Sequence, residues 1–167
     1  MPSPIWIVDT SAIIEIKSFV PRDQRERVFA AFTALITEGR LKFPVQVLHE
    51  LKRDVEGHRP DQVCRWALSV EDSACNVAPS YEEVKATLAV VPDILDSMKE
   101  SGIDEADPYV LALAAKLRLE GHDARVVVQE VKDTPKKLSL NTACGILGIP
   151  SVPLLGLLRA EGISTEA

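Results

Sequence analysis

The chain has 167 residues, of which 46% are hydrophobic and 26% charged, and its formal net charge is −6. A chain of this length and balance fits one globular domain whose core needs no metal or disulfide to hold it. The negative charge argues against a broad basic surface for coating nucleic acid, and the aromatic content of 5% argues against a platform for stacking bases. The three cysteines are widely spaced and no apolar run approaches the length of a bilayer span, so we expect a cytoplasmic protein.

The first informative stretch is residues 5–8, a short apolar run rich in β-branched residues, which is typical of a strand buried in a parallel sheet. The run ends at Asp9, and Thr10 and Ser11 can cap the helix that begins at residue 12. Asp9 therefore falls on a strand-to-helix turn, where open α/β sheets place their ligand crevice. The same carboxylate could serve only as a helix cap, so both roles stay open.

A helix is predicted over residues 21–39, with Arg22 and Arg25 near its start. Cations there oppose the helix dipole, so they either face a phosphate or form a solvated basic surface. After a short strand at 41–43, apolar spacing predicts a helix over 45–55. Glu50 borders the apolar stripe of that helix and can point either into a crevice or to water.

The middle block, residues 59–100, reads as helices with a break at Pro92 and carries no recognisable chemistry. We expect it to cover one end of the sheet or to supply a dimer surface. A further helix is predicted from Pro108 to residue 117, which makes Asp107 its natural N-cap. Asp107 shares a face with inward-packing apolar residues, and a role in capping alone stays open.

A second buried strand is predicted at residues 124–129, and it ends at Glu130, with Lys132 and Asp133 close behind. Lys136 and Lys137 form a basic turn after it. The remaining predicted elements are a helix, a short strand and a closing helix, over residues 138–147, 149–152 and 154–160.

Acidic residues thus stand at or near the ends of separate elements: Asp9, Glu50, Asp107, and Glu130 or Asp133. Strand and helix alternation brings such ends to one edge of a parallel sheet. Because clustered carboxylates repel, burying them together requires protons or a cation, and oxygen-only ligation favours Mg²⁺ or Mn²⁺. A pair of such ions can activate water for phosphodiester cleavage.

Three motifs resemble those of PIN-domain ribonucleases, among them the VapC-type toxins of toxin-antitoxin pairs. They are residues 8–12 (VDTSA), 47–51 (VLHEL) and 105–114 (EADPYVLALA). The resemblance spans about residues 4 to 155, and the A-D-P-Y variant of the third motif is closest to an uncharacterised prokaryotic PIN-like subgroup.

The resemblance implies a single domain over residues 1–167, folded as a three-layer α/β/α sandwich around a parallel sheet of four to five short strands. It also implies RNA cleavage that depends on Mg²⁺ or Mn²⁺, with Asp9, Glu50 and Asp107 as the metal-binding and catalytic acids. Thr10 or Ser11 matches the hydroxyl that supports the first acid. Glu130 matches the fourth metal-binding position by register, although the usual threonine is missing, and Asp104 and Asp133 are supporting candidates.

The implied partners are an RNA substrate, a small antitoxin that occludes the site, and a second copy of the chain in a homodimer. Five cationic residues are candidate RNA phosphate contacts: Arg22, Arg25, Lys132, Lys136 and Lys137. The alternative function is a PIN-like module that binds RNA or protein without catalysis. Phospho-receiver and dehalogenase-type folds also place acids at strand ends, but the sequence at Asp9 lacks the acidic pair or D-x-D that they need.

Overall fold

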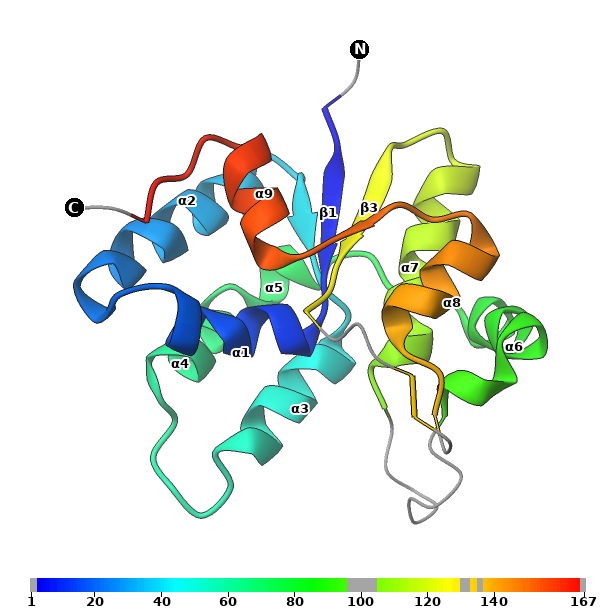
Figure 1. Ribbon diagram of the computed structural model, residues 1–167, viewed down its shortest axis with the longest axis horizontal. Helices are drawn as coiled ribbons and strands as arrows, with labels where there is room; N and C mark the ends of the chain where they lie inside the picture. The colour runs from blue at the N-terminus through cyan, green and yellow to red at the C-terminus, as the bar shows by residue number, and fades with distance from the viewer. Residues whose placement is uncertain (1–2, 96–104, 130–132, 135–136, 166–167) are drawn as a thin grey trace.

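The computed structural model describes residues 3–95, 105–129, 133–134 and 137–165 (Figure 1). Within these residues, four parallel strands form one sheet in the order β2-β1-β3-β4. The strands are β1 Ile5–Val8, β2 Leu41–Lys42, β3 Ala124–Val127 and β4 Ser151–Val152. Helices flank the sheet on both sides, so the expected three-layer α/β/α sandwich is confirmed.

Strand β1 is the centre of the sheet because it is paired on both edges. Trp6 is in register with Leu41 of β2 and with Arg125 of β3, and Val8 is in register with Val127. Trp6, Ile7 and Val8 are at most 1% exposed, as a continuous apolar run in a parallel sheet requires. Since the strands are parallel, the ends of β1 and β3 lie at the same edge, directly before Asp9 and before residue 128.

The helices divide between the two sides of the sheet. In Figure 1, α6, α7 and α8 lie to the right of the sheet, and α1, α2 and α9 lie to the left. On the right side the bounds are α6 Tyr81–Val90, α7 Asp107–Leu119 and α8 Leu140–Leu147. On the left side they are α1 Thr10–Phe19, α2 Arg25–Thr37 and α9 Leu154–Ala160. The other helical elements are α3 Val45–Asp54, α4 Gln62–Ser69, α5 Glu71–Ala74 and the 3₁₀ turns η1 Arg22–Gln24 and η2 Pro92–Ile94. No helix in the described part of the chain is long and apolar enough to cross a membrane.

The middle block is part of the core. Trp66 of α4 stacks on Phe29 with ring centroids 5.0 Å apart, and it contacts Phe32 and Phe43 at 5.9 Å and 6.5 Å. Its indole N–H donates to the hydroxyl of Thr33 at 3.0 Å. Trp66 of the middle block therefore packs against α2 and against Phe43, which follows β2. Helix α6 of the same block packs on α7, on the other side of the sheet. Residues 96–100 of the block lie outside the described residues.

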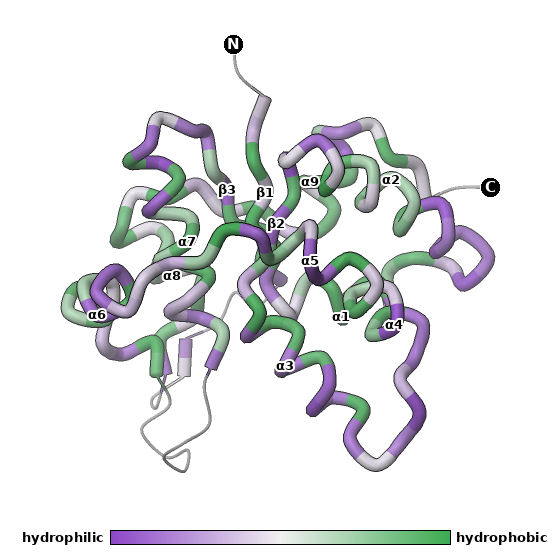
Figure 2. Tube along the Cα trace, turned by 180° about the vertical axis from the view of Figure 1, so that it is seen from behind, coloured by the Kyte–Doolittle hydropathy of each residue, from purple (hydrophilic) through white to green (hydrophobic). Residues whose placement is uncertain are grey.

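Several element boundaries differ from the sequence prediction. The predicted helix over 21–39 is divided into η1 and α2, because Arg25 and not Pro21 begins the regular α-helical hydrogen bonding. Helix α4 begins at Gln62, since the carboxylate of Asp61 accepts the backbone N–H of Cys64 at 2.9 Å and so caps it. Helix α3 ends at Asp54, one residue before the predicted end, and most of the connection to α4 is hydrophilic, purple in Figure 2. The short helix α5 was not predicted.

Candidate functional site

Asp9 is the N-cap of α1, and one of its two carboxylate oxygens accepts the capping hydrogen bonds. Oδ2 accepts the backbone N–H of Ser11 at 3.2 Å and the hydroxyl of Ser11 at 2.6 Å. The prediction that Thr10 and Ser11 cap this helix is wrong, because the extended backbone of β1 continues through Asp9. Asp9 is 3% exposed, and its Oδ1 is buried without a hydrogen-bond partner among the residues that the structure describes. The capping hydrogen bonds therefore use Oδ2 only, and the buried Oδ1 of Asp9 has no hydrogen-bond partner among the described residues.

Glu50 reaches the same edge of the sheet from α3. The hydroxyl of Thr10, itself 7% exposed, donates to Oε1 of Glu50 at 2.7 Å. Glu50 is half-buried, so of its two predicted orientations the structure has the one that points inward. The contact ties the side of α3 to the first residue of α1.

Asp107 begins α7 but does not cap it. The N-cap is Ala106, whose carbonyl accepts the N–H of Val110 at 2.9 Å, and no side chain caps this helix end. The prediction of Asp107 as N-cap is therefore wrong: it is the first helical residue, and Pro108 follows at a position where a missing N–H costs nothing. The carboxylate of Asp107 is 6% exposed, and its Oδ2 lies 2.8 Å from Nζ of Lys137.

The three acids act on one another electrostatically. Burial raises the pKa of Asp9 from its ordinary value of 3.8 to about 7, and the negative charges of Asp107 and Glu50 add to this rise. The hydrogen bonds from Ser11 oppose it only in part. The structure thus brings together acids from three elements that are far apart in the sequence, as predicted.

Two residues of the site were not assigned by the sequence. The backbone N–H of Gln129 donates to the hydroxyl of Ser11 at 3.0 Å, and the Gln129 side-chain oxygen accepts the N–H of Leu154 at 3.1 Å. Gln129 thus joins the end of β3 to the beginnings of α1 and α9, and its place directly before Glu130 could have indicated this. Burial, with the charges of Asp9 and Asp107, raises the pKa of the Cys144 thiol to about 12, which favours the protonated thiol at neutral pH.

Of the predicted cationic residues that the structure describes, Lys137 lies apart from Arg22 and Arg25. Lys137 lies at the acids, whereas the guanidinium of Arg25 donates to the carbonyls of Lys17 and Val20 at 2.6 Å and 3.1 Å. Those carbonyls stand at the end of α1 opposite Asp9, about 15 Å away for a helix of ten residues. Arg25 therefore stabilises the carboxyl end of α1.

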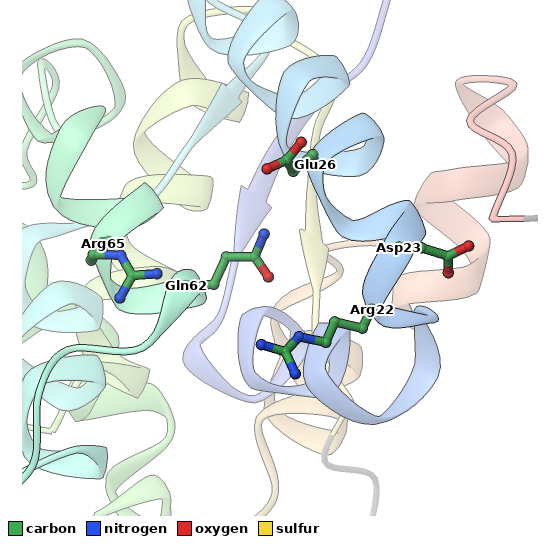
Figure 3. Close-up of a pocket in the computed structure, with 5 residues that line it drawn as sticks. All are labelled: Arg22, Asp23, Glu26, Gln62 and Arg65. Atoms are coloured by element: carbon green, nitrogen blue, oxygen red, sulfur yellow. The ribbon is translucent and has the colours of Figure 1, made fainter.

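Arg22 lies near the same end of α1 and lines a cavity of about 360 Å³ together with Arg65. In Figure 3, Arg22 and Gln62 reach toward each other across this cavity, while Asp23 points away. Arg22 and Arg25 are thus not brought to the acids. Lys132 and Lys136 lie outside the described residues.

The fourth acid has three candidates, of which one is described. Asp133 is exposed and its Oδ1 accepts the backbone N–H of Ser139 at 2.9 Å, beside the N-cap of α8. Hydrogen bonds from Ser139 and Thr142 lower the pKa of Asp133. The described contacts give Asp133 a role at the start of α8. Glu130 and Asp104 lie outside the described residues.

The donor set matches a hard divalent cation by its chemistry, since carboxylate oxygens are the ligands that Mg²⁺ and Mn²⁺ prefer. The buried Oδ1 of Asp9 is an atom that a cation would compensate. Among the described residues, however, no group of three or more His, Cys, Asp or Glu side chains is arranged to hold a metal ion. Asp107 faces Lys137, so this ion pair must break before the three acids share one ion.

The fold and the site define an α/β/α protein with a buried acidic cluster at the carboxyl edge of its sheet. Residues 6–165 match the family described as a domain of unknown function (DUF4411), and the chain belongs to that family. No curated protein and no solved structure gives a match to this chain. The matched range includes all the acids discussed above, so the candidate site lies inside the family's domain.

Proposed function

We propose that this chain is a metal-dependent endoribonuclease that hydrolyses RNA phosphodiester bonds with Mg²⁺ or Mn²⁺. The observation that carries the proposal is that Glu50 and Asp107 lie close enough to Asp9 for their charges to raise its pKa, while Oδ1 of Asp9 is buried and lacks a hydrogen-bond partner within the described residues. The resemblance of the three motifs to PIN-domain ribonucleases supports it independently.

In this proposal Asp9, Glu50 and Asp107 hold the cation, which when bound supplies an activated water and stabilises negative charge on the leaving oxygen. Ser11 fixes the carboxylate of Asp9 through Oδ2, which leaves Oδ1 for the ion. Thr10 orients Glu50 in the same way. Gln129 in turn holds the hydroxyl of Ser11, so the acids are positioned by hydrogen-bonded neighbours, as metal ligands in proteins commonly are.

The pKa of Asp9 gives a physical reason for a cation. Burial and the two neighbouring acids raise the pKa of this carboxyl, so they disfavour its charged form. A bound divalent ion would oppose both burial and the repulsion between the acids, because its positive charge favours the ionised form of Asp9. A site of this kind is more stable with the ion than without it.

The test combines RNA cleavage with metal binding. Wild type should cleave a structured RNA with Mn²⁺ and not with EDTA, and Asp9→Asn should remove cleavage while its circular dichroism spectrum is unchanged. Asp72→Asn is the matched control, because it removes one carboxylate charge from an exposed position of α5 that is not among the candidate site residues. Undiminished cleavage by Asp9→Asn would contradict the assignment.

From the resemblance we further propose that the chain is the toxin of a toxin-antitoxin pair, acts as a homodimer and is inhibited by a small antitoxin that covers the acids. Expression of wild type should then arrest growth and expression of Asp9→Asn should not, and light scattering should give the mass of a dimer.

The alternative, a non-catalytic binding module, is favoured by one observation: the described side chains do not form a ready metal shell. Isothermal titration with Mn²⁺ decides between the two functions. Binding to wild type that is lost in Asp107→Ala supports the nuclease, and no binding to wild type supports the module.

A further inference from the structure

A lysine enters the acidic cluster from the chain segment before α8. Nζ of Lys137 lies 2.8 Å from Oδ2 of Asp107, and the two side chains are 20% and 8% exposed. The contact is an ion pair and not an aligned hydrogen bond, because the geometry at Oδ2 does not satisfy one. An ammonium group so placed neutralises part of the charge that Asp9, Glu50 and Asp107 share.

The backbone of Lys137 is fixed. Its N–H and carbonyl pair with the carbonyl and N–H of Thr134 at 3.3 Å and 2.8 Å. The next residue, Leu138, donates its N–H to the carbonyl of Asp93 at 2.6 Å, and Ser139 donates to Asp133. The ammonium group can therefore leave Asp107 by rotation of the flexible four-carbon side chain, with no movement of the Lys137 backbone.

We propose that Lys137 is the resident counter-ion of the acidic cluster: its ammonium group takes the place beside Asp107 that a divalent cation needs, and the metal binds by displacing it. The inference rests on the proposed function, because it assigns Asp107 to the metal. It explains why three carboxylates are brought together without a ready metal shell among the described residues. Two cations cannot share Oδ2 of Asp107 closely, since they repel each other.

The consequence is that Lys137 has opposite effects on the protein with and without metal. In EDTA it stabilises the fold, because a buried carboxylate without its counter-charge is costly. With metal it weakens binding, because part of the affinity is used to break the ion pair.

The test is Lys137→Met, which keeps an unbranched side chain of similar length and removes the charge. Its matched control is Lys116→Met, since Lys116 also forms an ion pair, 3.3 Å from Glu83 and away from the acids. We expect Lys137→Met to lower the urea midpoint in EDTA and to bind Mn²⁺ about tenfold more tightly in calorimetry, which corresponds to about 1.4 kcal/mol. Lys116→Met should leave Mn²⁺ affinity unchanged.

A second comparison isolates the ion pair. In the Asp107→Asn background, Lys137→Met should no longer lower the urea midpoint, because the partner charge is already absent. Equal or weaker Mn²⁺ binding by Lys137→Met than by wild type overturns displacement while leaving the nuclease proposal in place. Absence of Mn²⁺ binding in both proteins overturns both proposals.

Discussion

Asp9→Asn should make the protein more stable at alkaline pH, in EDTA, although it removes a candidate catalytic residue. The pKa of Asp9 is about 7 in the folded protein and 3.8 is its ordinary value, which we take for the unfolded chain. Between these values the folded protein retains a proton that the unfolded chain releases. The contribution of Asp9 to the stability of wild type is therefore full below pH 4 and is lost as the pH rises from about 4 to 7.

The magnitude follows from the same two values. The full rise in pKa corresponds to a contribution of about 4 kcal/mol from Asp9 to the free energy of unfolding. Wild type loses about 2 to 3 kcal/mol of this contribution between pH 5 and pH 8. Asparagine has no charge at either pH, so Asp9→Asn does not suffer this loss. It does weaken the hydrogen bond from Ser11, at a cost of about 1 kcal/mol at both pH values. The free energy of unfolding of Asp9→Asn, relative to that of wild type, should therefore be about 2 to 3 kcal/mol higher at pH 8 than at pH 5.

Urea unfolding in EDTA at pH 5 and pH 8 measures this difference. Trp6 and Trp66 are 0% and 9% exposed, so their fluorescence reports loss of the core. Asp133→Asn is the control: the pKa of Asp133 is lowered, so removal of this carboxyl should give no gain at pH 8. An equal difference in the free energy of unfolding between Asp9→Asn and wild type at both pH values would refute the raised pKa of Asp9.

Further predictions follow from the contacts of the site and the core. Mn²⁺ should raise the urea midpoint of wild type at pH 8 as its concentration increases, and a midpoint independent of Mn²⁺ would contradict a metal site. Ser11→Ala should reduce Mn²⁺ affinity or cleavage about 10- to 100-fold with little change in circular dichroism, because it releases Oδ2 of Asp9; full activity would show that Ser11 does not position this acid. Thr10→Val should act in the same direction through Glu50, and the same two assays test it. Trp66→Ala should destabilise the fold by about 3 to 5 kcal/mol in urea unfolding, and a loss below 1 kcal/mol would mean that α4 is not part of the core.

Features that depend on local sequence were predicted well. The apolar run over residues 5–8 forms the central strand, and the closing helix has the predicted bounds 154–160. The spacing of the apolar residues and the length of the run suffice to predict these elements, because the buried residues of strands and helices recur at different intervals. The order of strands and acids also sufficed to predict that Asp9 and Asp107 meet, since parallel strands bring their ends to one edge.

Hydrogen-bond partners between distant elements were not predicted. Whether Glu50 points inward depends on the hydroxyl of Thr10, forty residues earlier in the chain. Helix α7 begins one residue earlier than predicted, with Ala106 and not Asp107 as its N-cap. A difference of one residue in the helix start depends on which carbonyl accepts the first helical hydrogen bond.

The sequence by itself determined that acids stand at the ends of separate strands and helices, because it sets where each element begins and ends. Only the tertiary structure decided what each polar side chain contacts. It placed Lys137 on Asp107, Arg25 at the far end of α1 and Asp133 at the start of α8. The reason is physical: a charged side chain takes the partner that packing brings within about 3 Å, and that distance depends on how all the layers of the fold are assembled.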